Sequence, residues 1–86
     1  MAKLVISTCD QSTTTYIVRF INATVQTRKL KMVVQLEYSK ITITGESQVV
    51  TYMKQWIITE LQELIEMQGK IEPMLKNVEE AQITEE

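Results

Sequence analysis

Residues 45–69 read GESQVVTYMKQWIITELQELIEMQG, and from residue 46 onward this stretch predicts a long helix over 46–69. Strong helix formers dominate the stretch, and Gly45-Glu46-Ser47 supplies a turn and an N-terminal cap. At 100° per residue, one arc of this helix is apolar and the opposite arc is polar, as in a helix that covers a core. The apolar arc that we expect to face the core holds Val50, Met53, Ile57, Leu61 and Leu64.

A second, shorter helix is predicted after the glycine at position 69, over residues 71–82. Gly69 is a natural C-terminal stop for the long helix, and Pro73 suits the first turn of the next one. The last residues, 83–86, are mostly polar, and we expect them to form a frayed tail.

The N-terminal half, residues 1–45, is predicted to form a four-stranded sheet. Its segments are rich in β-branched residues or alternate with period two, and they are Lys3–Ser7, Thr13–Val25, Lys29–Glu37 and Ile41–Thr44. The fold class is therefore α+β: a four-stranded antiparallel sheet packed on one long amphipathic helix, followed by a short C-terminal helix. We expect the whole chain, residues 1–86, to be a single domain.

Charge is divided between the two halves of the chain. Residues 1–45 hold six basic and two acidic residues, a net charge of +4, and residues 46–86 hold three basic and nine acidic residues, a net charge of −6. Strand parity predicts one sheet face that meets the helix and an opposite face with basic side chains. That basic sheet face is predicted to hold Lys3, Arg19, Lys29, Lys31 and Lys40. It either contacts an acidic partner or meets the acidic helices within or between subunits. The alternative without a function is that helices favour Glu and this sheet happens to favour Lys.

One edge of the apolar arc carries residues that a single sheet does not need to bury. This flank holds Val49, Tyr52, Trp56, Glu60 and Met67. Tyr52 and Trp56 are one helical turn apart, so their rings are predicted to overlap. Because Trp, Tyr and Met are enriched at protein interfaces, we interpret the flank as a second contact surface, with the edge of the core as the alternative.

The composition removes several classes of chemistry. There is no histidine for a general base or a metal ligand, one cysteine, and only two glycines, which cannot form a phosphate-binding loop. No catalytic, cofactor-binding or metal-binding residues are predicted, and we expect the chain not to be an enzyme. We find no signal peptide and no apolar run that could span a membrane, and therefore expect a cytoplasmic, intracellular protein.

Two functions follow from these observations. The sequence favours a protein-interaction module, an adaptor or inhibitor of a larger protein partner. Because a domain of 86 residues gains stability by associating, we expect it to act as a homodimer. The alternative is a nucleic-acid-binding protein that uses the basic sheet face. The overall net charge of −2 favours the first interpretation.

Overall fold

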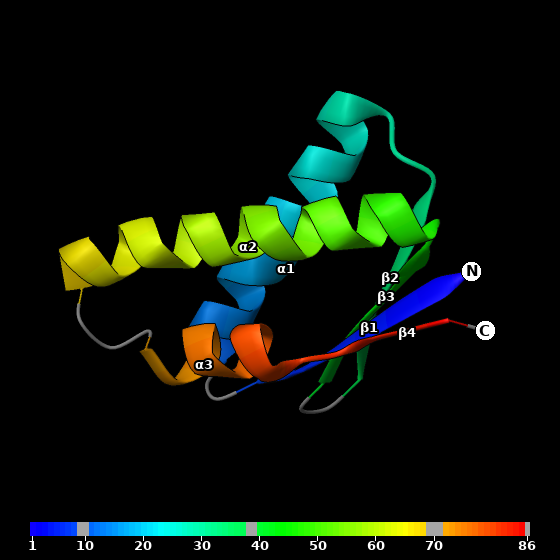
Figure 1. Ribbon diagram of the computed structural model, residues 1–86. Helices are drawn as coiled ribbons and strands as arrows, with labels where there is room; N and C mark the ends of the chain where they lie inside the picture. The colour runs from blue at the N-terminus through cyan, green and yellow to red at the C-terminus, as the bar shows by residue number, and fades with distance from the viewer. Residues whose placement is uncertain (9–10, 38–39, 69–71, 86) are drawn as a thin grey trace.

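Strands and helices alternate along most of the chain. The computed structural model describes residues 1–8, 11–37, 40–68 and 72–85. In chain order, the elements are β1 (Ala2–Ser7), α1 (Gln11–Arg28), β2 (Met32–Glu37), β3 (Lys40–Gly45), α2 (Ser47–Gln68), α3 (Glu72–Glu80) and β4 (Ile83–Glu85) (Figure 1). The predicted α+β class is confirmed, with one helix, α1, that the sequence analysis does not predict.

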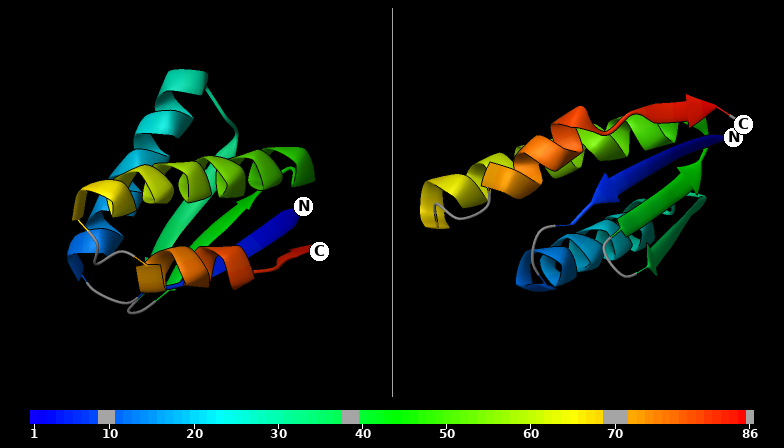
Figure 2. Two further views of the ribbon diagram at one scale, coloured as in Figure 1. Left: turned by 60° about the vertical axis from the view of Figure 1, so that its left-hand side comes forward. Right: turned by 90° about the horizontal axis from the view of Figure 1, so that it is seen from below.

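The four strands form one antiparallel sheet in the order β2-β3-β1-β4. Strand β1 lies between β3 and β4, and the hairpin partners β2 and β3 pair from Met32 opposite Gly45 to Glu37 opposite Lys40. Figure 2 shows the strands side by side, with the two chain termini close together at one end. With α3 as an extra helix, this is the ferredoxin-like β-α-β-β-α-β arrangement.

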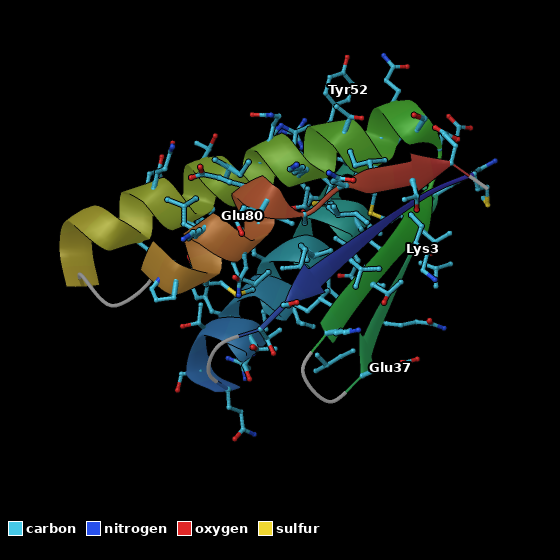
Figure 3. All side chains as sticks on the ribbon, turned by 60° about the horizontal axis from the view of Figure 1, so that its bottom comes forward. Lys3, Glu37, Tyr52 and Glu80 are labelled. Carbon is cyan, nitrogen blue, oxygen red and sulfur yellow. The ribbon has the colours of Figure 1, made fainter. Side chains whose placement is uncertain are left out.

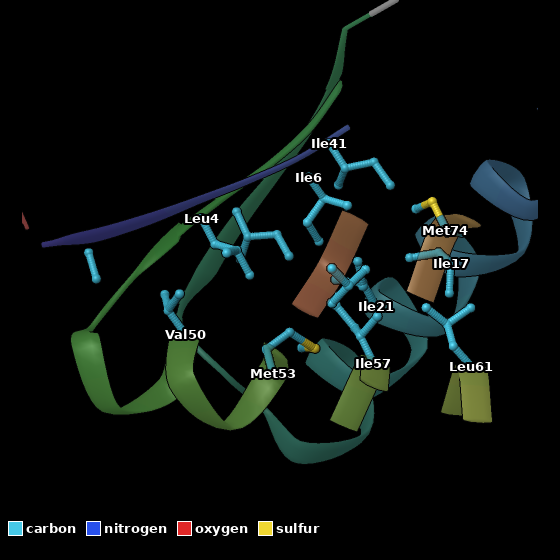
Figure 4. Close-up of a cluster of buried hydrophobic side chains, with 13 residues drawn as sticks. Leu4, Ile6, Ile17, Ile21, Ile41, Val50, Met53, Ile57, Leu61 and Met74 are labelled. Carbon is cyan, nitrogen blue, oxygen red and sulfur yellow. The ribbon is translucent and has the colours of Figure 1, made fainter. Parts of the chain in front are cut away.

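The core lies between one face of the sheet and the helices. Leu4, Ile6, Ile41 and Ile43 point to this side from β1 and β3 and are fully buried, as their shared parity predicts. They meet buried side chains from α1, α2 and α3 (Figure 4). The helix residues of this cluster are Ile17, Ile21, Val50, Met53, Ile57, Leu61, Met74 and Val78.

Helix α1 corrects the strand predicted over Thr13–Val25. Its buried residues are Thr14, Ile17 and Ile21, which recur with the spacing of a helix face. The segment is rich in β-branched residues, which favour strands, but packing of this face against the sheet outweighs that weak preference.

Backbone hydrogen bonds end α1 in a Schellman motif. The Leu30 amide donates to the Val25 carbonyl at 3.0 Å, and the Lys29 amide donates to the Gln26 carbonyl at 3.4 Å. Lys29 has a φ of 54°, the left-handed conformation that this motif requires and that glycine usually supplies. The helix therefore ends without the glycine that would have indicated its end in the sequence.

The C-terminal tail is a second correction. Ile83–Glu85 forms β4 and pairs with Ala2–Leu4, although residues 83–86 were predicted to be frayed. The ammonium of Lys54 donates to the Ala81 carbonyl at 2.6 Å and ties the approach to β4 to α2. Pro73 lies in the first turn of α3 as predicted, whereas the predicted stop at Gly69 lies outside the described residues.

Candidate interaction surface

A row of side chains at four-residue spacing runs along the side of α1 that faces α2. Tyr16, Phe20, Thr24 and Arg28 follow one another at successive turns, beside the buried row that contains Ile17 and Ile21. The hydroxyl of Thr24 donates to the Phe20 carbonyl at 2.8 Å and is thereby held close to the helix. This row faces the predicted flank of α2.

The flank residues of α2 form the other side of the surface. Tyr52 is 49% exposed and points away from the sheet (Figure 3), whereas Trp56 is half-buried and packs against the core. Their rings stack with centroids 6.0 Å apart and an interplanar angle of 24°, as the spacing of one turn predicts. The Nε2 of Gln48 donates to the Tyr52 hydroxyl at 3.1 Å and holds the outer ring in place.

Arg28 connects the two helices at one end of this surface. Its guanidinium carbon lies 4.3 Å from the centre of the Trp56 ring. At this distance the positive charge is attracted to the electron-rich ring face, and the planar guanidinium still presents its N–H groups at its edges. We call Arg28, Tyr52 and Trp56 the aromatic ridge.

Tyr16 and Glu60 connect the helices at the other end. The Tyr16 hydroxyl donates a hydrogen bond to the carboxylate of Glu60. This hydrogen bond raises the pKa of Tyr16 above its ordinary value, and desolvation and the negative charges of Glu60 and Glu63 raise it further. Glu60 of the flank therefore has a hydrogen-bond partner on α1.

A groove of about 220 Å³ lies between these two connections. Trp56 and Phe20 form its apolar part, and polar or charged side chains form the rest. The complete lining is Phe20, Thr24, Arg28, Trp56, Thr59 and Glu60. We call it the α1–α2 groove.

The two remaining flank residues are Val49 and Met67. Val49 is half-buried at the start of α2, and the side chain of Met67 lies outside the described part of the structure. The contributions of Tyr16, Phe20 and Arg28 are missed in the sequence because Tyr16 and Phe20 lie in a predicted strand, Thr13–Val25, and Arg28 lies between two predicted strands. Their four-residue spacing, which matches that of Tyr52, Trp56 and Glu60, is the signal that could have found them.

The basic sheet face is not assembled as predicted. Lys3 and Lys40 lie on the open face of the sheet, but Arg19 is exposed on α1 and is no sheet residue. Lys29 and Lys31 lie in the connection between α1 and β2. Two corrections explain this difference. Thr13–Val25 lies in helix α1 and not in a strand, which removes Arg19 from the sheet. The strand predicted over Lys29–Glu37 begins at Met32, which removes Lys29 and Lys31.

The described residues contain neither a metal-binding cluster nor a membrane-spanning helix. No group of three or more His, Cys, Asp and Glu side chains in this part of the chain is placed to hold a metal ion. Of the helices described, none has both the length and the apolar character needed to cross a membrane.

No known protein family, curated protein or solved structure matches this chain. The geometry of the surface is therefore the basis for a functional proposal.

Proposed function

We propose that this chain is a non-enzymatic protein-interaction module that binds a larger protein at the α1–α2 groove and acts as a homodimer. The observation that carries the proposal is the contiguous aromatic ridge of Arg28, Tyr52 and Trp56 beside that groove. Trp, Tyr and Arg are the residue types most enriched among the few side chains that dominate protein–protein binding.

The ridge is held in place before any partner arrives. Trp56 packs on the core and is flanked by the Tyr52 ring and the Arg28 guanidinium, and Gln48 holds the Tyr52 hydroxyl. Side chains that are already ordered lose little further conformational freedom on binding, and each such loss otherwise costs about 0.5–1.5 kcal/mol. The ridge therefore supports tight binding from a small area.

The lining of the groove indicates the chemistry of the partner segment. Phe20 and Trp56 provide an apolar site for an aliphatic or aromatic side chain. At one end the guanidinium of Arg28 can donate to a carboxylate, while at the other end the carboxylate of Glu60 already accepts from Tyr16. We therefore expect a partner segment with an apolar anchor and an acidic residue close to it.

The charge distribution supports this proposal over the nucleic-acid alternative. A protein that binds the phosphates of a nucleic acid needs several basic side chains on one surface. If it also stacks bases, it needs aromatic rings on that same surface. Here Arg19 lies on a different element from Lys3 and Lys40. The aromatic ridge lies on the helix side of the molecule, away from the open sheet face.

The test compares three immobilised proteins: the wild type, Tyr52→Ala and Gln62→Ala. Tyr52 is exposed, so its truncation removes the outer ring of the ridge without opening the core, which Trp56→Ala would also disturb. Gln62 is exposed on the same helix outside the groove and is the matched control. Each protein is incubated with extract of the native host, with and without nuclease treatment. Bound proteins are quantified by mass spectrometry and then titrated individually.

We expect at least one protein to bind the wild type and Gln62→Ala equally. Its affinity for Tyr52→Ala should fall by about 30-fold or more, which corresponds to the loss of about 2 kcal/mol at an interface hot spot. Equal binding to all three proteins would place the site elsewhere. Binding that disappears after nuclease treatment would support the nucleic-acid alternative.

A further inference from the structure

The two edges of the sheet differ in their hydrogen bonding. At one edge, β4 pairs with Ala2–Leu4, and the side chain of Asn77 in α3 donates to the Ser7 carbonyl at 3.0 Å farther along β1. At the opposite edge, β3 is the one strand of the described residues that pairs with β2. Among the described residues, no strand or side chain hydrogen-bonds to the outer side of β2.

Strand β2 lacks the features that usually protect a free edge. Such edges are typically short, bulged, or interrupted by proline or an inward-pointing charge. All six residues of β2 pair one to one with β3, without a bulge, and the strand reads MVVQLE with its only charge at the end. Figure 3 shows Glu37 at this end of the strand, on the border of the sheet.

Apolar side chains are exposed along β2 on both faces of the sheet. Val33 is 58% exposed on the open face. Leu36 is 52% exposed on the face that carries the helices, although Ile41, opposite it on β3, is fully buried. A strand added beside β2 would shield both side chains and satisfy the free backbone groups.

We propose that the homodimer forms when β2 pairs antiparallel with β2 of a second copy, around a two-fold axis at Val34, to join the two sheets into one. This inference identifies the interface of the self-association that the proposed function includes, and it places it away from the α1–α2 groove. In an interface with a two-fold axis, both copies contribute the same strand. The sequence of that strand must therefore be complementary to itself when it is read in the opposite direction.

The sequence of β2 and its preceding residue meet this requirement. With Val34 opposite its own copy, Met32 faces the second copy's Leu36, and Val33 faces its Gln35. Lys31 then faces the oppositely charged Glu37 of the second copy, and symmetry produces this pair twice. Opposite charges in directly paired positions stabilise antiparallel strands, and like charges destabilise them.

The test is a charge-reversal cycle followed by sedimentation equilibrium at micromolar concentration. The wild type should sediment as a dimer of 10.0 kDa subunits. Lys31→Glu and Glu37→Lys each place like charges opposite each other twice across the dimer interface, and each should raise the dimer dissociation constant about tenfold. Glu37→Lys also places like charges opposite each other within one chain, at Lys40, so Lys31→Glu is the cleaner of the two single variants. The double variant Lys31→Glu/Glu37→Lys restores opposite charges and should recover most of the wild-type affinity.

Two control variants separate pairing at β2 from a general effect of charge and from association through the aromatic ridge. Lys29→Glu changes the net charge by the same amount as Lys31→Glu, at a position outside the proposed strand pairing, and it should leave the dissociation constant unchanged. Tyr52→Ala should also leave it unchanged, because the aromatic ridge is not part of this interface. Circular dichroism checks that each variant is folded, and slower amide exchange over Met32–Glu37 at higher protein concentration reports directly on strand pairing.

Several results would overturn the inference. One is a monomeric wild type, and another is a double variant whose dimer dissociation constant is as high as that of the single variants. A third is a dimer whose dissociation constant is raised by Lys29→Glu or Tyr52→Ala but not by Lys31→Glu. A monomer that still binds a protein through Tyr52 would reject the dimer and leave the groove proposal standing. A dimer whose dissociation constant responds to the charge-reversal variants as expected, in a protein that binds no partner, would support the dimer and reject the groove proposal.

Discussion

At the scale of single residues, the contact between Tyr16 and Glu60 determines how one end of the α1–α2 groove responds to pH. The neutral phenol donates to the carboxylate, so the folded protein favours protonated Tyr16 and its pKa is raised. The stabilisation is complete below the ordinary tyrosine pKa of about 10 and is lost as the pH rises through the higher value of the folded state. This contact is therefore intact throughout the neutral range.

Glu60→Gln should lower the pKa of Tyr16 towards about 10, because it removes the charged acceptor. The titration is followed by NMR from the ring carbon that carries the Tyr16 hydroxyl. The control Glu79→Gln removes the same charge from α3 and should leave Tyr16 unchanged. Identical titration of Tyr16 in wild type and Glu60→Gln would contradict the assigned hydrogen bond.

At the scale of secondary-structure elements, Lys29 controls how α1 ends. A residue with a Cβ atom is strained in the left-handed conformation, by about 1–2 kcal/mol, and glycine is not. Lys29→Gly should therefore raise the free energy of unfolding by up to about 1 kcal/mol, since glycine also adds freedom to the unfolded chain. Lys29→Ala also removes the side chain but keeps the strain, so it should not stabilise. Urea unfolding followed by circular dichroism measures both.

The two variants together distinguish backbone strain from an effect of the lysine side chain. If Lys29→Ala stabilised the fold as much as Lys29→Gly, the effect would come from the loss of the side chain and not from the backbone conformation at this helix end.

Helix α1 also marks the limit of what the sequence could predict. Helix α2 was predictable because its composition and its periodicity both indicate a helix. In α1 the two disagree: the composition favours a strand, while Ile17 and Ile21 follow the helical period, and the end at Lys29 lacks a glycine. The short strand β4 had no local signal at all, because its partner β1 lies at the other end of the chain.

The same distinction applies to the candidate surface. The overlap of Tyr52 and Trp56 follows from positions within one helix, so the sequence predicted it correctly. The contribution of Arg28 depends on how α1 and α2 lie against each other, which no local pattern encodes. The free edge of β2 likewise depends on strand order, which no local pattern in the sequence encodes.

At the scale of the whole molecule, the charge difference between the two halves does not produce a basic face. The first half provides three of the four strands together with α1, and its lysines and arginines are divided among the sheet, the helix and the connection between them. Of the five residues predicted for that face, Lys3 and Lys40 share the open face of the sheet. Glu37, which pairs with Lys40 across β2 and β3, reduces the positive charge there.

This distribution leads to a prediction about nucleic acids. Each phosphate neutralised on duplex DNA contributes about 0.9 log units of affinity per log unit of salt. Two lysines on the open face can therefore give a slope of about 1.8, and we expect no detectable binding to labelled duplex or single-stranded oligonucleotides at physiological salt. Fluorescence anisotropy over a salt series measures this. The contrary result is tight binding with a slope near that of five phosphates that Lys29→Glu/Lys31→Glu abolishes. It would mean that basic residues on different elements converge on one ligand. It would then favour the nucleic-acid function over the protein-binding one.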